Sequence, residues 1–217
     1  MAMSMDGKIA TKSRGPVKLG SEYDSRRMAE IRAEHDAVIN GASTFRAYPK
    51  PLHVVGEDLL AARQARGQAE QPISAMVSSR LDIPRGTDWE NALSAPRWAF
   101  CGAGAEGATV ASLRANGVTV VQTPGARPSP KEILEAFRAA GIKSLLLEGG
   151  GEFNASFLEQ GLVDVIHLTL VPIVVGGAES PTWCEGVGFP KGKFPRFELA
   201  ECRNVEGELY LTYRRQG

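Results

Sequence analysis

Short apolar runs alternate with amphipathic segments along most of the chain. Apolar runs of strand length end in turns rich in glycine and serine, and the segments between several of them repeat apolar residues at helical spacing. The predicted strands cover residues 36–40, 73–80, 97–101, 117–121, 143–148 and 163–175, and the predicted helices cover 21–35, 57–70, 130–140 and 152–160. Strands that alternate with helices predict an α/β fold, with a mostly parallel central sheet and helices on both of its faces.

Both ends of the chain depart from this alternation. A short strand is predicted from Ala2 to a turn at Asp6, and residues 194–215 predict a C-terminal antiparallel β-hairpin. Such a hairpin often adds to a sheet edge, where it could mediate dimerisation. Residues 178–193 form a Pro- and Gly-rich loop that could fold over a site as a lid. A single domain over residues 1–217 is expected, with two small domains as the alternative.

The segment from Lys143 to Glu159 reads as a strand, a glycine-rich turn and a helix. The strand ends in Glu148, and Gly149, Gly150 and Gly151 follow it. Glycines let a ligand approach the backbone, and the free N–H groups of a helix N-terminus favour anions, although a tight connection needs no ligand. A carboxylate at the end of a buried strand is costly unless something partners it, which favours a site here.

Other predicted strands also end in residues suited to phosphate. Gly41 is followed by Ser43 and Thr44, whose hydroxyls suit a phosphate but could equally cap a short helix. The next strand ends in Ser79 and Arg80. A guanidinium pairs well with a phosphate, although exposed arginines are common at strand ends.

A further strand end, Gly102 to Gly107, matches the G-x-G-x-x-G pattern of dinucleotide-binding folds. That pattern expects an acidic residue about 20 positions later, at the end of the next strand. Gln122 and Thr123 stand there instead. A Rossmann fingerprint is therefore disfavoured, while Gly102 stays a candidate for the cofactor site.

These turns are expected to share one cleft, because ligands bind at the carboxyl ends of parallel strands. Their common placement is the argument, since each signal also has a purely structural explanation. The expected cleft residues are Asp6, Gly41 to Thr44, Ser79 and Arg80, Gly102 to Gly104, and Glu148 to Gly151.

The composition mainly excludes certain partners, sites and locations of the protein. The 25 basic and 25 acidic residues give a formal net charge of zero without a basic block, so no nucleic-acid partner is indicated. Cys101, Cys184 and Cys202 are widely spaced, which fits a reducing cytoplasm better than a disulfide framework. The three histidines lack metal-ligand spacing. No apolar run approaches the roughly 20 residues of a membrane span, and no signal-peptide pattern is present.

Motifs spread in order along nearly the whole chain resemble one family. They are Met3 to Ala10, Arg32 to Ala37 with Gly41 to Thr44, Leu147 to Gly151, and Val171-Pro172 with Gly176-Gly177. Together they resemble the reductase domain of bacterial riboflavin biosynthesis, which has the three-layer dihydrofolate reductase-like fold. The resemblance implies NADPH-dependent reduction of a ribosylamino-pyrimidine 5′-phosphate to its ribitylamino form. Hydride would reach the sugar C1′ after the ring opens to an imine.

The same resemblance implies roles for the strand-end residues. The phosphates and nicotinamide side of NADPH would be held by Gly41, Ser43, Thr44 and the glycines at 149, 150 and 151. Ser79 and Arg80 would receive the adenosine 2′-phosphate. Asp6 and Glu148 would lie near the nicotinamide and the pyrimidine ring as catalytic residues, where a carboxylate can accept ring N–H bonds.

Substrate contacts are expected from Ser4, Asp6, Lys8, Arg26 and Glu148, with Arg27 and Lys18 as further candidates for the substrate phosphate. The stretch from Phe45 to Leu52 lacks the acidic residue that family members usually carry. Two alternatives stay open: a related reductase of another heterocycle or carbonyl, and a non-catalytic nucleotide-binding protein on the same fold. A homodimer is expected.

Overall fold

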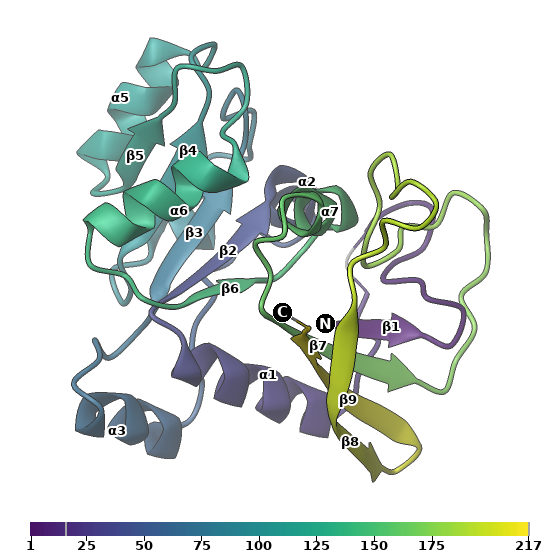
Figure 1. Ribbon diagram of the computed structural model, residues 1–217. Coiled ribbons are helices and arrows are strands. Elements are labelled where there is room, and N and C mark those ends of the chain that lie inside the picture. The colour runs from purple at the N-terminus through teal and green to yellow at the C-terminus, as the bar shows by residue number, and fades with distance from the viewer. Residues whose placement is uncertain (16, 217) are drawn as a thin grey trace. The chain divides into compact units, whose positions relative to one another are not determined.

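The computed structural model describes residues 1–15 and 17–216 (Figure 1). The chain forms two compact units. One unit comprises residues 26–148, and the other comprises residues 1–25 and 149–217. Pro16, in the loop expected between residues 11 and 20, and Gly217 lie outside the described residues. A single domain over residues 1–217 stays a prediction.

The unit of residues 26–148 is built on a five-stranded parallel sheet with the strand order β5-β4-β3-β2-β6. Every neighbouring pair in this sheet is parallel. Its strands are β2 (Ala37–Gly41), β3 (Ile73–Val77), β4 (Arg97–Cys101), β5 (Thr119–Gln122) and β6 (Leu145–Leu147). Its helices are α2 (Ala42–Ala47), α3 (Glu57–Ala65), α4 (Asp88–Asn91), α5 (Gly107–Ala115) and α6 (Pro130–Ala139).

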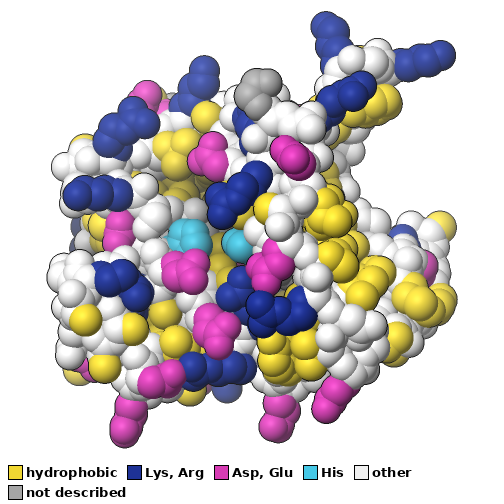
Figure 2. Space-filling view, turned by 60° about the horizontal axis from the view of Figure 1, so that its bottom comes forward, with side chains coloured by type: hydrophobic (Ala, Val, Ile, Leu, Met, Phe, Trp, Pro, Cys, Tyr) yellow, Lys and Arg dark blue, Asp and Glu magenta, His cyan; other side chains and the backbone are white. Residues whose placement is uncertain are grey.

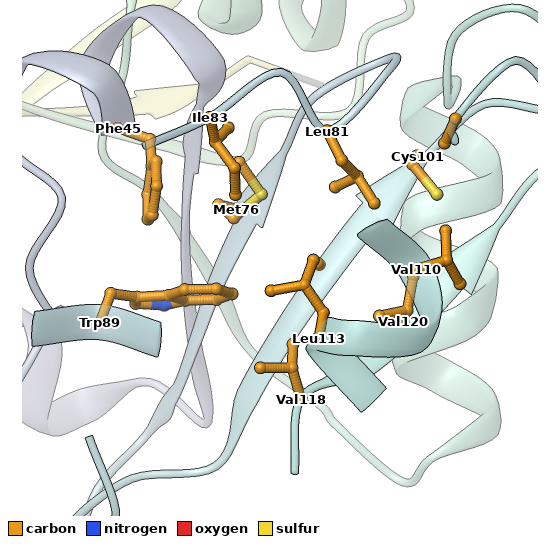
Figure 3. Close-up of a cluster of buried hydrophobic side chains, with 12 residues drawn as sticks. Phe45, Met76, Leu81, Ile83, Trp89, Cys101, Val110, Leu113, Val118 and Val120 are labelled. Carbon is orange, nitrogen blue, oxygen red and sulfur yellow. The ribbon is translucent and has the colours of Figure 1, made fainter. Parts of the chain in front are cut away.

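Helices cover both faces of this parallel sheet, as predicted. On one face Trp98 and Phe100 of β4 pack against Phe137 of α6, with ring centroids 5.1 Å apart in each pair. Because side chains alternate along a strand, the neighbouring β4 residues face the opposite side. There a buried cluster joins the sheet to α2, α4 and α5 (Figure 3): Phe45, Met76, Leu81, Ile83, Trp89, Ala99, Cys101, Ala105, Val110, Leu113, Val118 and Val120.

Helix starts follow the sequence signals in two cases and differ in a third. At α6, Ser129 and Glu132 form a capping box ahead of Pro130. Helix α1 (Glu22–Glu34) follows Ser21, whose Oγ accepts the Asp24 N–H at 3.2 Å and so caps the helix. Helix α2, however, begins at Ala42 with Gly41 as its N-cap, so the alternative of a cap from Ser43 or Thr44 is wrong.

Helix α3 is shorter than expected and is not simply a surface helix. It ends at Ala65 because Gly67 takes a positive φ of 72°, and its Arg63 is only 1% exposed. The guanidinium of Arg63 donates to the carbonyls of Ala33 at 3.0 Å and His35 at 2.6 Å. These are carbonyls that the end of a helix leaves without a partner, so a buried arginine here has a structural role.

The second unit contains a four-stranded mixed sheet and helix α7 (Gly151–Glu159). The strands are β1 (Ala2–Ser4), β7 (Val165–Val171), β8 (Phe197–Val205) and β9 (Glu208–Arg215), in the order β1-β7-β9-β8. Strand β1 is parallel to β7, and β9 is antiparallel to both β7 and β8. The predicted C-terminal hairpin is confirmed, and it extends the sheet of β7 rather than the five-stranded sheet.

Acidic and basic side chains are interspersed on the face shown in Figure 2. None of the described helices is long and apolar enough to cross a membrane.

Candidate functional site

In the unit of residues 26–148, four predicted site positions stand in a row at the carboxyl edge of the sheet. They are Gly102 after β4, Ser79 after β3, Gly41 at the end of β2 and Glu148 after β6. The Gly102 N–H donates to Ser79 O at 2.9 Å, and the Glu148 N–H donates to Ile39 O at 2.9 Å. The parallel register therefore brings together residues that lie up to 107 positions apart in the chain.

Glu148 is held by an arginine that the sequence analysis did not assign to the site. The Nε and Nη2 atoms of Arg32 donate to its two carboxylate oxygens at 2.5 and 2.6 Å, and only 10% of the Glu148 side chain is exposed. Arg32 Nη1 donates to the carbonyl of His53 at 3.0 Å. Burial works to lower the pKa of Arg32, but the charge and hydrogen bonds of Glu148 outweigh it and raise that pKa.

The partner that a carboxylate at this strand end requires is therefore present within the unit. A bidentate arginine uses only part of the acceptor capacity of a carboxylate, so Glu148 can still accept from a ligand. Arg32 opens one of the motifs that carry the family resemblance, but no local signal tells that it pairs with a residue 116 positions away.

Tyr48 and His53 interact with this ion pair, although no local signal in the sequence marks either residue as part of the site. Tyr48, at the C-cap of α2, is 51% exposed, and its phenol helps to raise the pKa of Arg32. Lys50 Nζ lies 5.5 Å from the centre of the Tyr48 ring. Burial and the charge of Arg32 lower the pKa of His53. A neutral imidazole is thus favoured beside the arginine.

The turn after β3 leaves Arg80 without a partner. Leu81 follows it with a φ of 56° and a side chain that is 3% exposed in the buried cluster. Within residues 1–15 and 17–216, the Arg80 guanidinium makes no hydrogen bond or ion pair, and the same holds for the hydroxyls of Ser43 and Thr44. These polar groups remain able to bind a ligand.

Gly102 has a structural reason to be glycine. A Cβ at this position would overlap the carbonyl oxygen of Ala126 and lie 2.7 Å from that of Gly125. The Ala103 N–H donates to Gly125 O at 2.9 Å. The close backbone approach that Gly102 permits is therefore made by the chain's own loop, which explains the first glycine of the G-x-G-x-x-G match.

Arg26, expected at the substrate, is engaged by carboxylates on the surface. Its guanidinium donates to both Asp58 oxygens, at 3.1 and 2.5 Å, and to Glu30 at 3.2 Å. Arg27 also reaches Glu30, at 3.4 Å. A substrate phosphate would have to compete with these acids, so the geometry offers no support for Arg26 or Arg27 as its ligand.

In the other unit, Asp6 fastens the turn after β1 to the segment after β7. Its carboxylate accepts from Ser4 Oγ at 2.6 Å, from the Val175 N–H at 3.1 Å and from the Gly176 N–H at 2.7 Å. The Ser4 hydrogen bond, followed by that of Val175, lowers the pKa of Asp6 to about 2. Asp6 therefore stays ionised near neutral pH and cannot serve as a proton donor there.

Lys8 is also tied into this part of the unit. Its Nζ donates to the carbonyl of Ser180 at 2.8 Å, and its backbone N–H donates to Ser4 Oγ at 3.0 Å. Ser4, Asp6 and Lys8, all expected at the substrate, thus belong to one hydrogen-bonded group. Lys18 makes no side-chain contact of this kind with the described residues.

The glycines from 149 to 151 form the start of α7, and the peptide between Gly149 and Gly150 is cis. A Cβ on Gly151 would overlap Thr182 O and lie 2.6 Å from Glu185 Cγ. The Asn154 side chain donates to Trp183 O at 2.8 Å. The loop that was expected to act as a lid is thus anchored on α7 in its middle, rather than being a free flap.

The cleft predicted from the sequence would take residues from both units, and it stays a prediction.

The sheet and its helices define the general class of this protein. Dihydrofolate reductase from Enterococcus faecalis aligns with the whole chain and 94% of its own length, with a TM-score of 0.50 and 15% identity. The protein therefore has the predicted dihydrofolate reductase-like α/β fold.

Comparison with relatives identifies the family within this fold class. It belongs to the RibD C-terminal domain family, whose model matches residues 1–211. The 2,5-diamino-6-ribosylamino-4(3H)-pyrimidinone 5′-phosphate reductase of Archaeoglobus fulgidus is 32% identical over 196 residues, covering 88% of this chain and 86% of that protein. A pyrimidine reductase-like protein from Corynebacterium diphtheriae has a TM-score of 0.87 at 21% identity, covering 100% and 90% of the two chains.

Proposed function

We propose that this protein is an NADPH-dependent reductase of a ribosylamino-pyrimidine 5′-phosphate in riboflavin biosynthesis. The observation that carries the proposal is the match, over 88% of this chain and 86% of the relative, to the Archaeoglobus fulgidus reductase, whose name states such a substrate. In the proposed reaction the ribosyl group becomes ribityl, through hydride transfer to C1′ of the opened sugar. NADPH supplies that hydride when it is bound.

The residues at the sheet edge fit this cofactor. Ser79 and Arg80 are proposed to receive the 2′-phosphate, which the free guanidinium of Arg80 supports. Gly41 with the free hydroxyls of Ser43 and Thr44 is proposed for another phosphate of the cofactor. The glycines at 149 to 151 are proposed for its nicotinamide side, because glycine lets a ligand approach the backbone closely.

Glu148 is proposed to accept N–H hydrogen bonds from the pyrimidine ring. Arg32 would act as a positioning residue, because its two parallel hydrogen bonds fix the plane of the Glu148 carboxylate. Asp6, which stays ionised, is proposed to act as a hydrogen-bond acceptor that also holds its turn in place, with Ser4 and Lys8 in support. Hydride chemistry belongs to the cofactor, so the protein contributes positioning and electrostatics.

A homodimer in the cytoplasm is the remaining part of the proposal. Strand β8 is the outer strand of its sheet and is exposed along most of its length, which supports edge pairing with a second copy. The wide cysteine spacing supports a reducing compartment. Size-exclusion chromatography with light scattering tests the dimer, and a mass near 23.3 kDa, that of one chain, would overturn it.

The decisive experiment has two stages. Calorimetric titration with NADPH and NADH should give tighter binding of NADPH. Turnover should then be followed through the absorbance of NADPH with the ribosylamino-pyrimidine phosphate, in both its 2-amino and its 2-oxo form. NADPH binding without oxidation on either form would exclude this substrate and favour a related reductase or a non-catalytic nucleotide-binding protein.

A further inference from the structure

The loop after β5, residues 123–128, is built tightly onto the carboxyl end of β4. The Thr123 N–H donates to Cys101 O at 2.8 Å, and Ala103 donates to Gly125 O at 2.9 Å. Gln122 Nε2 donates to Gly102 O at 3.3 Å. Since Gly102 also lacks a side chain where Ala126 approaches, this loop has a fixed position beside the end of β4.

The loop presents an arginine that has no role in the function proposed above. Arg127 is exposed, and its side chain makes no hydrogen bond or ion pair with any described residue. Arg80, on the other side of β4, is likewise exposed, and its side chain makes no hydrogen bond or ion pair with any described residue. The acid on the intervening turn, Glu106, accepts a hydrogen bond from Thr109 Oγ1 at 3.0 Å.

The turn after β4, which lies between the two arginines along the sheet edge, is open at Gly104. Strand β4 lies between β3, which Arg80 follows, and β5, which Arg127 follows. Its end carries Gly102, Ala103 and Gly104, and a Cβ added at Gly104 would meet nothing within 4 Å. Neighbouring strands are about 4.8 Å apart, so the ends of β3 and β5 are separated by roughly 10 Å. Two arginine side chains can span that gap.

We propose that Arg127 and Arg80 together bind a phosphomonoester over the end of β4, namely the 2′-phosphate that distinguishes NADPH from NADH. This rests on the proposed function, since it assigns a second residue to the cofactor preference. Two guanidiniums without acidic partners repel each other, and a doubly charged phosphate relieves that repulsion while accepting hydrogen bonds from both. The first glycine of the G-x-G-x-x-G match is then accounted for, because Gly102 allows the loop that presents Arg127 to approach.

The test compares cofactor affinities of Arg127→Ala with those of the unchanged protein by calorimetry. NADPH should bind about tenfold or more weakly, as expected for a lost charge-assisted hydrogen bond, and NADH should bind as before. Arg138→Ala is the matched control, because Arg138 is an exposed arginine of the same unit that also makes no side-chain contact with a described residue. An equal loss for both cofactors, or no loss, would overturn the assignment.

A fragment titration gives a second readout that needs neither hydride transfer nor the nicotinamide. Adenosine 2′,5′-bisphosphate should lose affinity in Arg127→Ala and in Arg80→Ala, whereas adenosine 5′-monophosphate should not. The double variant should bind NADPH no better than NADH. If the unchanged protein shows no preference for NADPH, the proposed cofactor is wrong. If the preference exists and survives Arg127→Ala, only the role of Arg127 is wrong.

Discussion

At the scale of single residues, Arg32 and Glu148 form a buried ion pair at the sheet edge. Each charge is largely removed from water, and each is tolerated because the other supplies two hydrogen bonds. The two hydrogen bonds from Arg32 fix the orientation of the Glu148 carboxylate, whereas a carboxylate on a solvent-exposed side chain would rotate freely. This pairing also makes the loss of either partner costly.

Replacing Arg32 with alanine should therefore destabilise the protein by about 2–4 kcal/mol, because Glu148 would be left as an uncompensated buried charge. Urea denaturation followed by circular dichroism measures this. The matched control is Arg27→Ala on the same helix, whose more exposed ion pair with Glu30 should be worth about 1 kcal/mol or less. Similar losses in the two variants would contradict the importance of burial.

Asp6 gives a prediction on pH dependence. Its pKa is lowered from 3.8 to about 2 in the folded protein, so its stabilising contribution is present above pH 3.8 and is lost as the pH falls through 2. Thermal unfolding of the unchanged protein and of Asp6→Asn should differ near neutral pH, and the difference should shrink steadily as the pH falls from 3.8 to about 2. A difference that stays constant over this range would show that the carboxylate charge is not responsible.

At the scale of elements, the turn after β4 and the loop after β5 depend on each other. Gly102 has no room for a Cβ, since backbone oxygens of the loop occupy that position, while the space at Gly104 is open. Of these two glycines in one motif, Gly102 thus has a steric reason to lack a side chain, whereas Gly104 has none.

Alanine at these two positions tests this difference. Gly102→Ala should cost about 1–3 kcal/mol through overpacking and should also weaken binding of NADPH more than of NADH, because the loop that carries Arg127 is displaced. Gly104→Ala should change stability by no more than about 1 kcal/mol. Chemical denaturation and calorimetry on both variants provide the measurement, and equal effects would remove the proposed link between loop and strand end.

At the scale of the whole molecule, a cofactor that binds only the folded protein should stabilise it. NADPH at about 100 times its dissociation constant would add about 2.7 kcal/mol. At one fixed concentration, NADPH should raise the melting temperature more than NADH does. Arg80→Ala should reduce that difference, while Arg138→Ala should preserve it. A thermal shift that is equal for both cofactors in the unchanged protein would contradict selective recognition of the 2′-phosphate.

The sequence by itself determined the kind and order of most of the main elements, although helix α5 (Gly107–Ala115) was not predicted. Local signals suffice for this: apolar runs of strand length, apolar residues at helical spacing and the turn of the C-terminal hairpin all act over a few residues. It also indicated the carboxyl edge of the parallel sheet, because strand direction follows from the alternation with helices.

Only the tertiary structure decided which residues meet. Arg32 reaches Glu148 across 116 positions, and Arg63 buries itself against the end of α1. The loop at Ala126 fills the space beside Gly102, and β7 joins β1 and β9 in a sheet separate from the parallel one. Which residues come into contact depends on the order of the strands in each sheet and on how side chains pack between the elements. Neither is encoded in the spacing of neighbouring residues, so both emerge only when the chain is folded.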